Sequence, residues 1–82
     1  METISLPYRV HVTKEGNSVN FTTNGTVLAT IAYREDINKY ELANLGPYFS
    51  ADTYEEVDQK ARLRVRKLLA SFGVRGVFLD EQ

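Results

Sequence analysis

The stretch 53-TYEEVDQKARLRVRKLLASF-72 decides the fold, because its apolar residues recur every three or four positions. This spacing places them on one stripe of an α-helix whose opposite side is polar. The sequence therefore predicts one long amphipathic helix over about residues 53–72, with its stripe packed on an apolar surface. The residues of the stripe are Tyr54, Val57, Ala61, Val65, Leu68, Leu69 and Phe72.

The two ends of this helix carry capping signals. At the start, Asp52 with Glu55 three positions later is a capping-box pattern. A Ser50 cap is the alternative, because it would let Phe49 pack on the first turn of the helix. At the other end, Gly73 suits the left-handed residue that commonly follows a helix.

Four segments before the helix alternate apolar and polar residues, with the period of a strand that has one buried face. They predict strands over about residues 6–14, 18–23, 26–34 and 39–45. The fold class is therefore α+β: a four-stranded antiparallel meander packed on one C-terminal helix, with residues 1–82 forming a single domain. The expected core face consists of Tyr8, Val10, Val12, Val19, Phe21, Val27, Ala29, Ile31, Tyr33, Tyr40 and Leu42.

The second turn tests this arrangement, because a slip by one residue moves a whole apolar set to the other face of a sheet. A two-residue turn at positions 24–25 would place Phe21 opposite Leu28 and divide the core between the two faces. A three-residue loop over positions 23–25, with Gly25 left-handed in a bulge, instead places Phe21 opposite Val27. We therefore predict the three-residue loop.

The other two turns are expected to keep the apolar residues on the same face. At the first turn, pairing Val12 with Val19 leaves either residues 14–17 or residues 15–16 as the loop. At the third, pairing Tyr33 with Tyr40 leaves residues 35–38, which include the Asp and Asn that favour turns.

The residues after the helix include a short apolar run, Val77 to Leu79. This run predicts either an extra strand over residues 76–79 or an arm packed on the domain. Leu63 lies nearly opposite the apolar stripe, where this segment or a partner chain could cover it. A single exposed leucine is also normal on a protein surface.

Length limits what the chain can hold. A chain of 82 residues has room for one core and buries only about 60% of its unfolded surface. We therefore expect no internal cavity of the ~300 Å³ or more that commonly holds a small ligand, and no small-molecule substrate.

Composition and charge narrow the setting. The chain has no cysteine, which excludes disulfides and thiolate chemistry and favours a reducing, cytoplasmic compartment. Ten Lys and Arg against eleven Asp and Glu give a net charge of −1, so no overall field favours nucleic acid or an anionic membrane. The first residues lack the pattern of a signal peptide, and no apolar run approaches the length of a membrane span.

Residues for catalysis or metal binding are sparse. The single histidine, His11, is expected on the outer face of the sheet, beside Arg9 and opposite Asn20, with no carboxylate next to it. The serines and glycines match no nucleophile elbow or phosphate-binding loop. We therefore predict no enzyme activity, no metal site and no cofactor.

The helix contains five cations within eight residues, which as a linear pattern would indicate a nucleic-acid site. When the helix is wound at 3.6 residues per turn, these cations separate onto two sides of the apolar stripe. Their aliphatic stems are then expected to cover the sheet edges, with Asp58 four residues before Arg62 as a helix ion pair. The five are Lys60, Arg62, Arg64, Arg66 and Lys67.

The outer face of the sheet is the second candidate surface. A sheet followed by a helix resembles the element order of the three-stranded DNA-binding domains of some integrases and plant transcription factors, although no family motif accompanies it. That order implies strands lying in a DNA groove.

These observations predict a small non-enzymatic interaction or regulatory protein that binds a protein partner or itself through a surface. The alternative is a DNA- or RNA-binding module that uses the outer sheet face and one basic side of the helix. The candidate interaction surface comprises Arg9, His11, Leu28, Thr30, Arg34, Lys39, Tyr48, Phe49, Arg62, Leu63 and Arg66.

Overall fold

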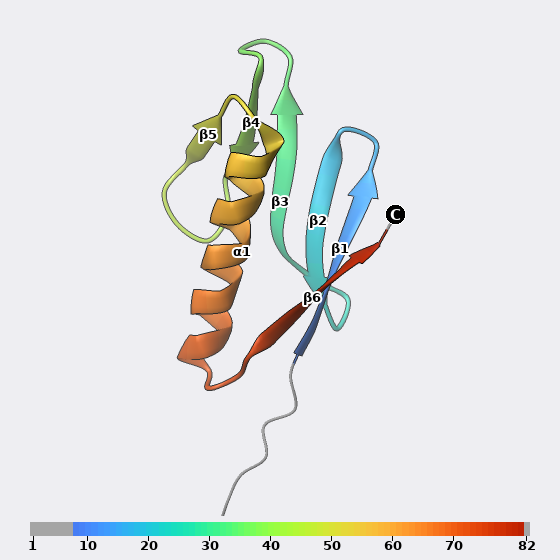
Figure 1. Ribbon diagram of the computed structural model, residues 1–82, viewed down its shortest axis with the longest axis vertical. Helices are drawn as coiled ribbons and strands as arrows, with labels where there is room; N and C mark the ends of the chain where they lie inside the picture. Colours follow the sequence, from blue (N-terminus) through green and yellow to red (C-terminus); the bar gives the residue numbers. More distant parts are fainter. Residues whose placement is uncertain (1–7, 82) are drawn as a thin grey trace, which may run out of the picture.

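The computed structural model describes residues 8–81 and contains six β-strands and one α-helix (Figure 1). The strands form one sheet in the order β5-β4-β3-β2-β1-β6. Neighbouring strands are antiparallel except β1 and β6, which run parallel. The elements are β1 (Tyr8–Glu15), β2 (Ser18–Thr23), β3 (Thr26–Arg34), β4 (Lys39–Leu42), β5 (Phe49–Ala51), α1 (Tyr54–Ser71) and β6 (Gly76–Glu81).

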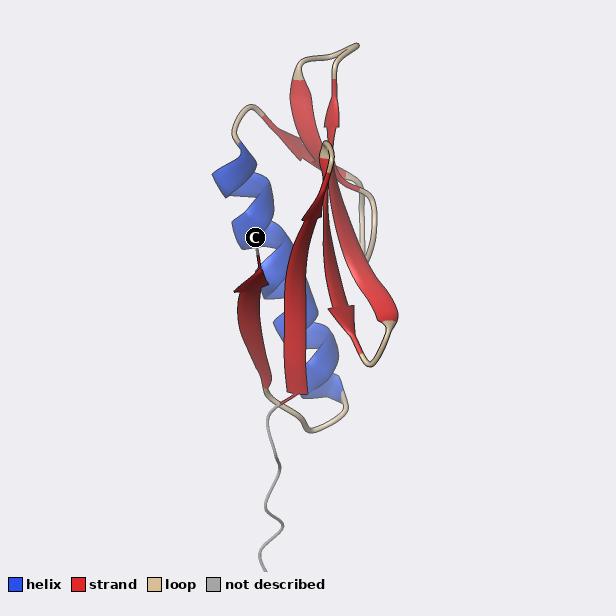
Figure 2. Ribbon diagram, turned by 90° about the vertical axis from the view of Figure 1, so that its right-hand side faces the viewer, coloured by secondary structure: helices blue, strands red, loops and turns tan. Residues whose placement is uncertain are grey.

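The helix and the sheet form two layers (Figure 2). α1 lies against one face of the sheet, the inner face, where it contacts β3, β4, β5 and β6. Because α1 leads from β5 at one edge to β6 at the other, it is the crossover that lets β6 run parallel to β1. The α+β class is confirmed.

The predicted four-stranded meander is incomplete, because one further strand joins the sheet at each edge. β6 confirms the strand expected over residues 76–79 and extends it to residue 81. β5 was not predicted, since its three residues are too few to show an alternating pattern. The predicted first strand began at residue 6, and residues 6 and 7 lie outside the described part of the chain.

Strand β4 ends at Leu42 rather than at the predicted residue 45. Leu45 and Gly46 have φ values of 62° and 134°, so the chain turns there and leaves the sheet. The side chain of Asn44 takes the place of a strand partner, because its Oδ1 accepts a hydrogen bond from Thr30 N at 3.1 Å.

The first hairpin has a different register from the predicted one. Val12 pairs with Phe21, not with Val19, and a two-residue turn connects Glu15 to Ser18. Gly16 has a φ of 59°, as the first central residue of a type II′ turn requires. The error is a shift of two positions, which leaves every side chain on its predicted face.

The second hairpin contradicts the predicted three-residue loop. Thr23 pairs with Thr26 across a two-residue turn, in which Asn24 and Gly25 both have positive φ, as in type I′ turns. The register then shifts at a bulge in β3, so that Phe21 pairs with Ala29 rather than with Val27. The bulge adds the one residue that restores the apolar residues to the inner face.

The bulge exchanges the roles of two neighbouring residues. Leu28, which was predicted on the outer face, is partly buried against the core. Val27, which was predicted in the core, pairs with Thr22 and is 53% exposed. The third hairpin is as predicted, with Tyr33 opposite Tyr40 and residues 35–38 as the turn.

The core lies between α1 and the inner face of the sheet. Two other predicted core positions are wrong: Tyr8 begins β1 at the margin of the sheet and is 41% exposed, and Phe72 is 75% exposed. Phe72 lies beyond the last helical residue, with φ −99° and ψ 7°, so it leaves the line of the stripe. The buried apolar residues are Val10, Val12, Val19, Phe21, Ala29, Ile31, Leu42, Ala51, Val57, Ala61, Val65 and Leu69.

Capping residues determine where α1 begins and ends. Both predicted N-caps are wrong, because Thr53 occupies that position and its Oγ1 accepts a hydrogen bond from Glu56 N at 3.3 Å. At the C-terminus, Gly73 has a φ of 77°, and Val74 N donates to Leu69 O at 3.0 Å, which completes a Schellman motif. No helix within residues 8–81 has the length and apolar character needed to cross a membrane.

Candidate functional site

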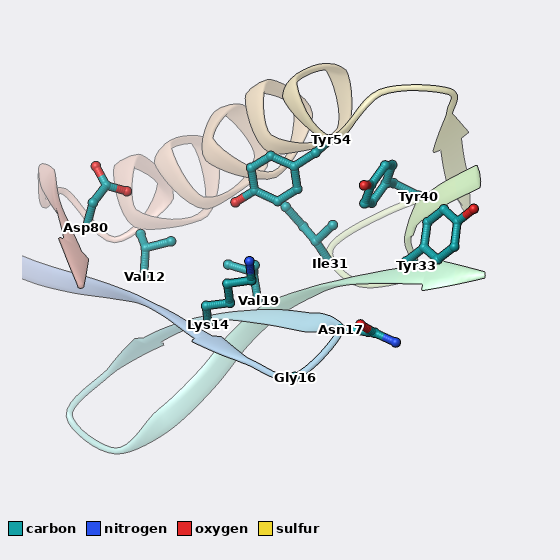
Figure 3. A pocket seen from close by; sticks show the side chains of 10 residues that line it. All are labelled: Val12, Lys14, Gly16, Asn17, Val19, Ile31, Tyr33, Tyr40, Tyr54 and Asp80. Atoms are coloured by element: carbon teal, nitrogen blue, oxygen red, sulfur yellow. The ribbon is translucent and has the colours of Figure 1, made fainter. Parts of the chain in front are cut away.

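A hollow of about 520 Å³ opens on the inner face of the sheet, between the start of α1 and the β1–β2 hairpin (Figure 3). The first turn of α1 supplies Tyr54 to it, strands β3 and β4 supply Ile31, Tyr33 and Tyr40, and the β1–β2 hairpin supplies the opposite side. Its base is apolar and belongs to the core. The lining residues are Val12, Lys14, Gly16, Asn17, Val19, Ile31, Tyr33, Tyr40, Tyr54 and Asp80.

Three tyrosines form one side of the hollow (Figure 3). Tyr33 and Tyr40 are cross-strand neighbours on β3 and β4, with ring centroids 4.9 Å apart. Tyr54, the first residue of α1, meets Tyr40 edge to face at 5.9 Å. Contacts of this kind stabilise aromatic pairs beyond the area that they bury, so the rings support one another as a rigid surface.

The hydroxyl group of Tyr54 is held in its neutral form. Burial and, to a smaller extent, the nearby carboxylate of Asp58 together raise its pKa to about 12. The hydroxyl donates a hydrogen bond to Asp58 Oδ1 at 3.4 Å. At neutral pH the tyrosine side of the hollow therefore carries no negative charge from this residue.

The two charged residues of the lining differ in their surroundings. The carboxylate of Asp80 accepts a hydrogen bond from Arg62 Nη2 at 2.6 Å, and the same guanidinium also pairs with Asp58. Lys14 forms no ion pair with any residue whose side chain the structure describes, and it is exposed. Lys14 therefore supplies a positive charge to the lining that no described carboxylate contacts directly.

This combination suits binding more than covalent chemistry. An apolar base and aromatic side can hold an apolar group, and Lys14 can attract a neighbouring carboxylate. The single histidine of the chain, His11, does not line the hollow. Across the described side chains, no group of three or more His, Cys, Asp or Glu lies close enough to hold a metal ion.

The structure places the predicted outer-face residues on the opposite side of the sheet from the hollow. His11 is half-buried between Thr22 and Leu79 in the register, not opposite Asn20 as predicted. Arg9 is exposed on the same strand and pairs with Val77. This part of the predicted surface is therefore a strip across β1 and β6.

The outer-face residues of β3 and β4 are engaged within the domain. Arg34 forms ion pairs with Asp36 and with Glu41, the latter at 3.2 Å. Its hydrogen bond holds the pKa of the Asp36 carboxyl below its usual value. Thr30 donates from its hydroxyl to Asn20 Oδ1 at 2.8 Å. The charge of Arg34 is therefore compensated within the domain.

Lys39 also has an internal partner, the carboxylate of Asp52, at 2.7 Å. That hydrogen bond and the charge of Lys39 lower the pKa of Asp52. Since Asp52 follows β5 directly, this ion pair joins β4 to the segment that leads into α1. Lys39 is therefore part of a structural contact.

The helix cations lie on two sides of the stripe, as the sequence indicated. Arg62 and Arg66 both lie over the ring of Phe78, each with its guanidinium carbon 5.0 Å from the centroid. Lys60 lies on the other side, 5.1 Å from the ring of Phe49. The predicted ion pair between Arg62 and Asp58 is confirmed at 2.9 Å. Arg62 and Arg66 thus cover the inner face of β6.

The remaining predicted residues are scattered. Tyr48 is 55% exposed and donates a hydrogen bond to Glu41 Oε1 at 3.0 Å, whereas Phe49 is packed against the core. Leu63 is 45% exposed on the far side of α1. The candidate interaction residues therefore do not converge on one surface.

Sequence reasoning missed the hollow and assigned it no residues. The length argument predicted no internal cavity of this size, but the hollow is open to the surface. A signal was present, since Lys14 follows Val10 and Val12 on the same face of β1 and shows that the core ends there. Two tyrosines in cross-strand register were a second sign of a partly exposed aromatic surface.

No protein-family model, curated protein or solved structure matches this chain.

Proposed function

We propose that this protein is a small non-enzymatic interaction protein that binds a segment of a protein partner in the hollow. The partner segment would place an aliphatic or aromatic side chain against the three tyrosines and an acidic residue beside Lys14. The observation that carries the proposal is the union of an apolar base, an aromatic side and a lysine that no described carboxylate contacts directly, in one hollow of about 520 Å³.

The aromatic side supports a protein partner in particular. Tyrosine is enriched among the residues that contribute most to protein interfaces, because it buries a large area with few rotatable bonds. Tyr33, Tyr40 and Tyr54 are only partly exposed and are held by ring contacts, so binding would order little additional side chain.

The charge of the hollow supports an acidic partner segment. Lys14 lies opposite Val19 on the inner face, next to the apolar base. A carboxylate beside it would gain attraction, and a cation there would be repelled. The preference for acidic over basic segments should weaken as salt is added.

The test is selection of random heptapeptides displayed on phage against the full chain, followed by calorimetric titration of the selected peptides. We expect peptides with an apolar anchor next to Asp or Glu. Tyr40→Ala should weaken their binding about tenfold or more, as loss of an interface aromatic commonly does. Lys14→Glu should also weaken binding.

Lys67→Glu is the matched control, because it makes the same charge change on the exposed side of α1 near its C-terminal end. It should leave peptide affinity unchanged. Selected peptides that bind the Tyr40→Ala and Lys14→Glu variants as tightly as the unmodified protein would contradict the proposal.

Nucleic-acid binding stays an alternative prediction with less support. Arg34 and Lys39 each have a carboxylate partner, and Arg62 has two. Few cations of the predicted nucleic-acid surface are therefore free to neutralise phosphates. The absence of cysteine leads us to propose a reducing, cytoplasmic compartment.

A further inference from the structure

β6 is an edge strand of the sheet, and its first four residues are uncharged. β6 has β1 on one side and no neighbouring strand among the described residues on the other. Natural edge strands are commonly blunted by proline, charged side chains, a bulge or shortness, and within Gly76–Glu81 only the last two residues are charged. On the outer face Val77 and Leu79 are 38% and 36% exposed.

The backbone groups that β6 presents at its free edge follow from one hydrogen bond. Tyr8 N donates to Arg75 O at 2.8 Å, and Tyr8 pairs with Gly76. In a parallel ladder, every second residue of a strand directs its backbone N–H and C=O toward the partner strand. The residues between them direct both groups away from it. Val77 and Leu79 therefore bond to β1, and Gly76, Phe78 and Asp80 direct N–H and C=O to the free edge.

We propose that the β6 edge binds the same edge of a second copy of this chain, antiparallel and about a twofold axis at Phe78. This self-association goes beyond the proposed partner binding and uses a different surface. In this register Phe78 opposes Phe78 of the second copy, and Gly76 opposes Asp80 in both directions. All are residues with outward polar groups, so each pair exchanges both N–H···O bonds.

The side chains in this register complement one another. Val77 of each copy lies opposite Leu79 of the other on the outer face, at the closely spaced positions of an antiparallel ladder. A shift by one residue would set outward polar groups against inward ones, so the ladder geometry excludes it.

α1 lies on the inner face of the sheet and ends at the turn that leads into β6 (Figure 1), and no strand among the described residues pairs with the free edge. Two copies would form one continuous sheet with both helices on the same face. The isologous contact closes after two copies, which favours a dimer over a filament.

The experiment measures mass in solution by sedimentation velocity over a range of concentrations. We expect twice the 9.3 kDa of one chain at high concentration. The double variants V77E/L79E and V77K/L79K place like charges opposite each other, so each should dimerise at least about tenfold more weakly. An equimolar mixture of the two should regain the dimer, since unlike charges then oppose.

The control is Val27→Glu, which adds the same charge to an exposed outer-face position on the β2–β3 hairpin and should leave dimerisation unchanged. Amide hydrogen exchange on the unmodified protein gives a test that needs no variant. Exchange at Phe78 and Asp80 should slow as concentration rises. A monomer at every concentration, a dimer that persists in both double variants, or concentration-independent exchange at these amides would each overturn the proposal.

Discussion

The two edge strands of the sheet, β5 and β6, are held in place by different kinds of contact with the same helix. β5 has three residues and follows a loop in which Leu45 and Gly46 adopt positive φ. Arg64 holds that loop by donating hydrogen bonds to Asn44 O at 2.9 Å and Pro47 O at 2.6 Å. β6 is longer and is held by its ladder with β1 and by the aromatic ring of Phe78.

The difference explains the basic run of α1. Arg64 binds backbone carbonyls at the β5 side, and Arg62 and Arg66 lie over Phe78 at the β6 side. In a run that resembles a nucleic-acid-binding pattern, these three arginines contact residues at both sides of the sheet. The following variants separate these two roles.

Phe78→Ala should have the largest effect, because it removes the ring that meets Phe21 edge to face at 6.0 Å and lies under Arg62. We expect a loss of about 3 kcal/mol in the free energy of unfolding, measured by urea denaturation. Val77→Ala, on the outer face of the same strand, is the control and should cost much less. A loss for Phe78→Ala no larger than that of the control would show that β6 is held by its ladder alone.

Arg64→Met tests the β5 edge, since it keeps an apolar stem and removes both hydrogen bonds to the loop. The expected loss is about 1 to 2 kcal/mol, reduced by solvent exposure. Hydrogen exchange should accelerate in residues 43–51 and remain unchanged in β6. Lys67→Met serves as the control for removal of an exposed helix cation. Equal acceleration at both edges would contradict the separation proposed here.

Thr53→Ala removes the N-cap that joins β5 to α1 and should cost about 1 kcal/mol. Thr53→Ala should accelerate hydrogen exchange in residues 43–51 less than Arg64→Met does, because the cap stabilises the first turn of the helix and not the loop. Thr53→Ser keeps the hydroxyl and should retain most of the stability, measured by thermal unfolding. If serine and alanine destabilise equally, the hydroxyl is not the cause.

The smallest expected effect is on the stability of the protein at acidic pH. The ion pair with Lys39 holds the pKa of Asp52 below its ordinary value of 3.8, so its contribution to stability is present above that pH. This contribution is lost as pH falls below about 4 and through the lowered pKa of the folded state. Asp52→Asn should remove that part of the acid dependence in urea unfolding at several pH values. If the free energy of unfolding of Asp52→Asn falls below pH 4 as steeply as that of the unmodified protein, this role is excluded.

The sequence predicted the elements whose pattern is local. The stripe of α1 is regular over five turns, and Tyr33 with Tyr40 is fixed by a turn rich in Asp and Asn, so both predictions are confirmed. The β1–β2 register was missed because a shift of two residues preserves every face. The bulge was missed because adjacent Val27 and Leu28 permit either residue to face inward.

The candidate site was hidden for a different reason. Each of its residues has an ordinary place in a strand or helix, and only the angle between α1 and the β1–β2 hairpin leaves the space between them. That arrangement is set by contacts between residues far apart in the chain, such as Leu69 of α1 with Gly76 of β6. No local pattern encodes it.

The ladder between β1 and β6 has a consequence for folding kinetics. It joins Tyr8 to Gly76, the most distant pairing in the sheet, whereas the meander pairs neighbouring segments. Closing a longer loop costs more chain entropy before any contact forms, so the hairpins should form first and β6 last. Until β6 pairs with β1, the outer edge of β1 has no strand partner. The rate of β1–β6 pairing therefore sets how long another strand can pair with β1 incorrectly.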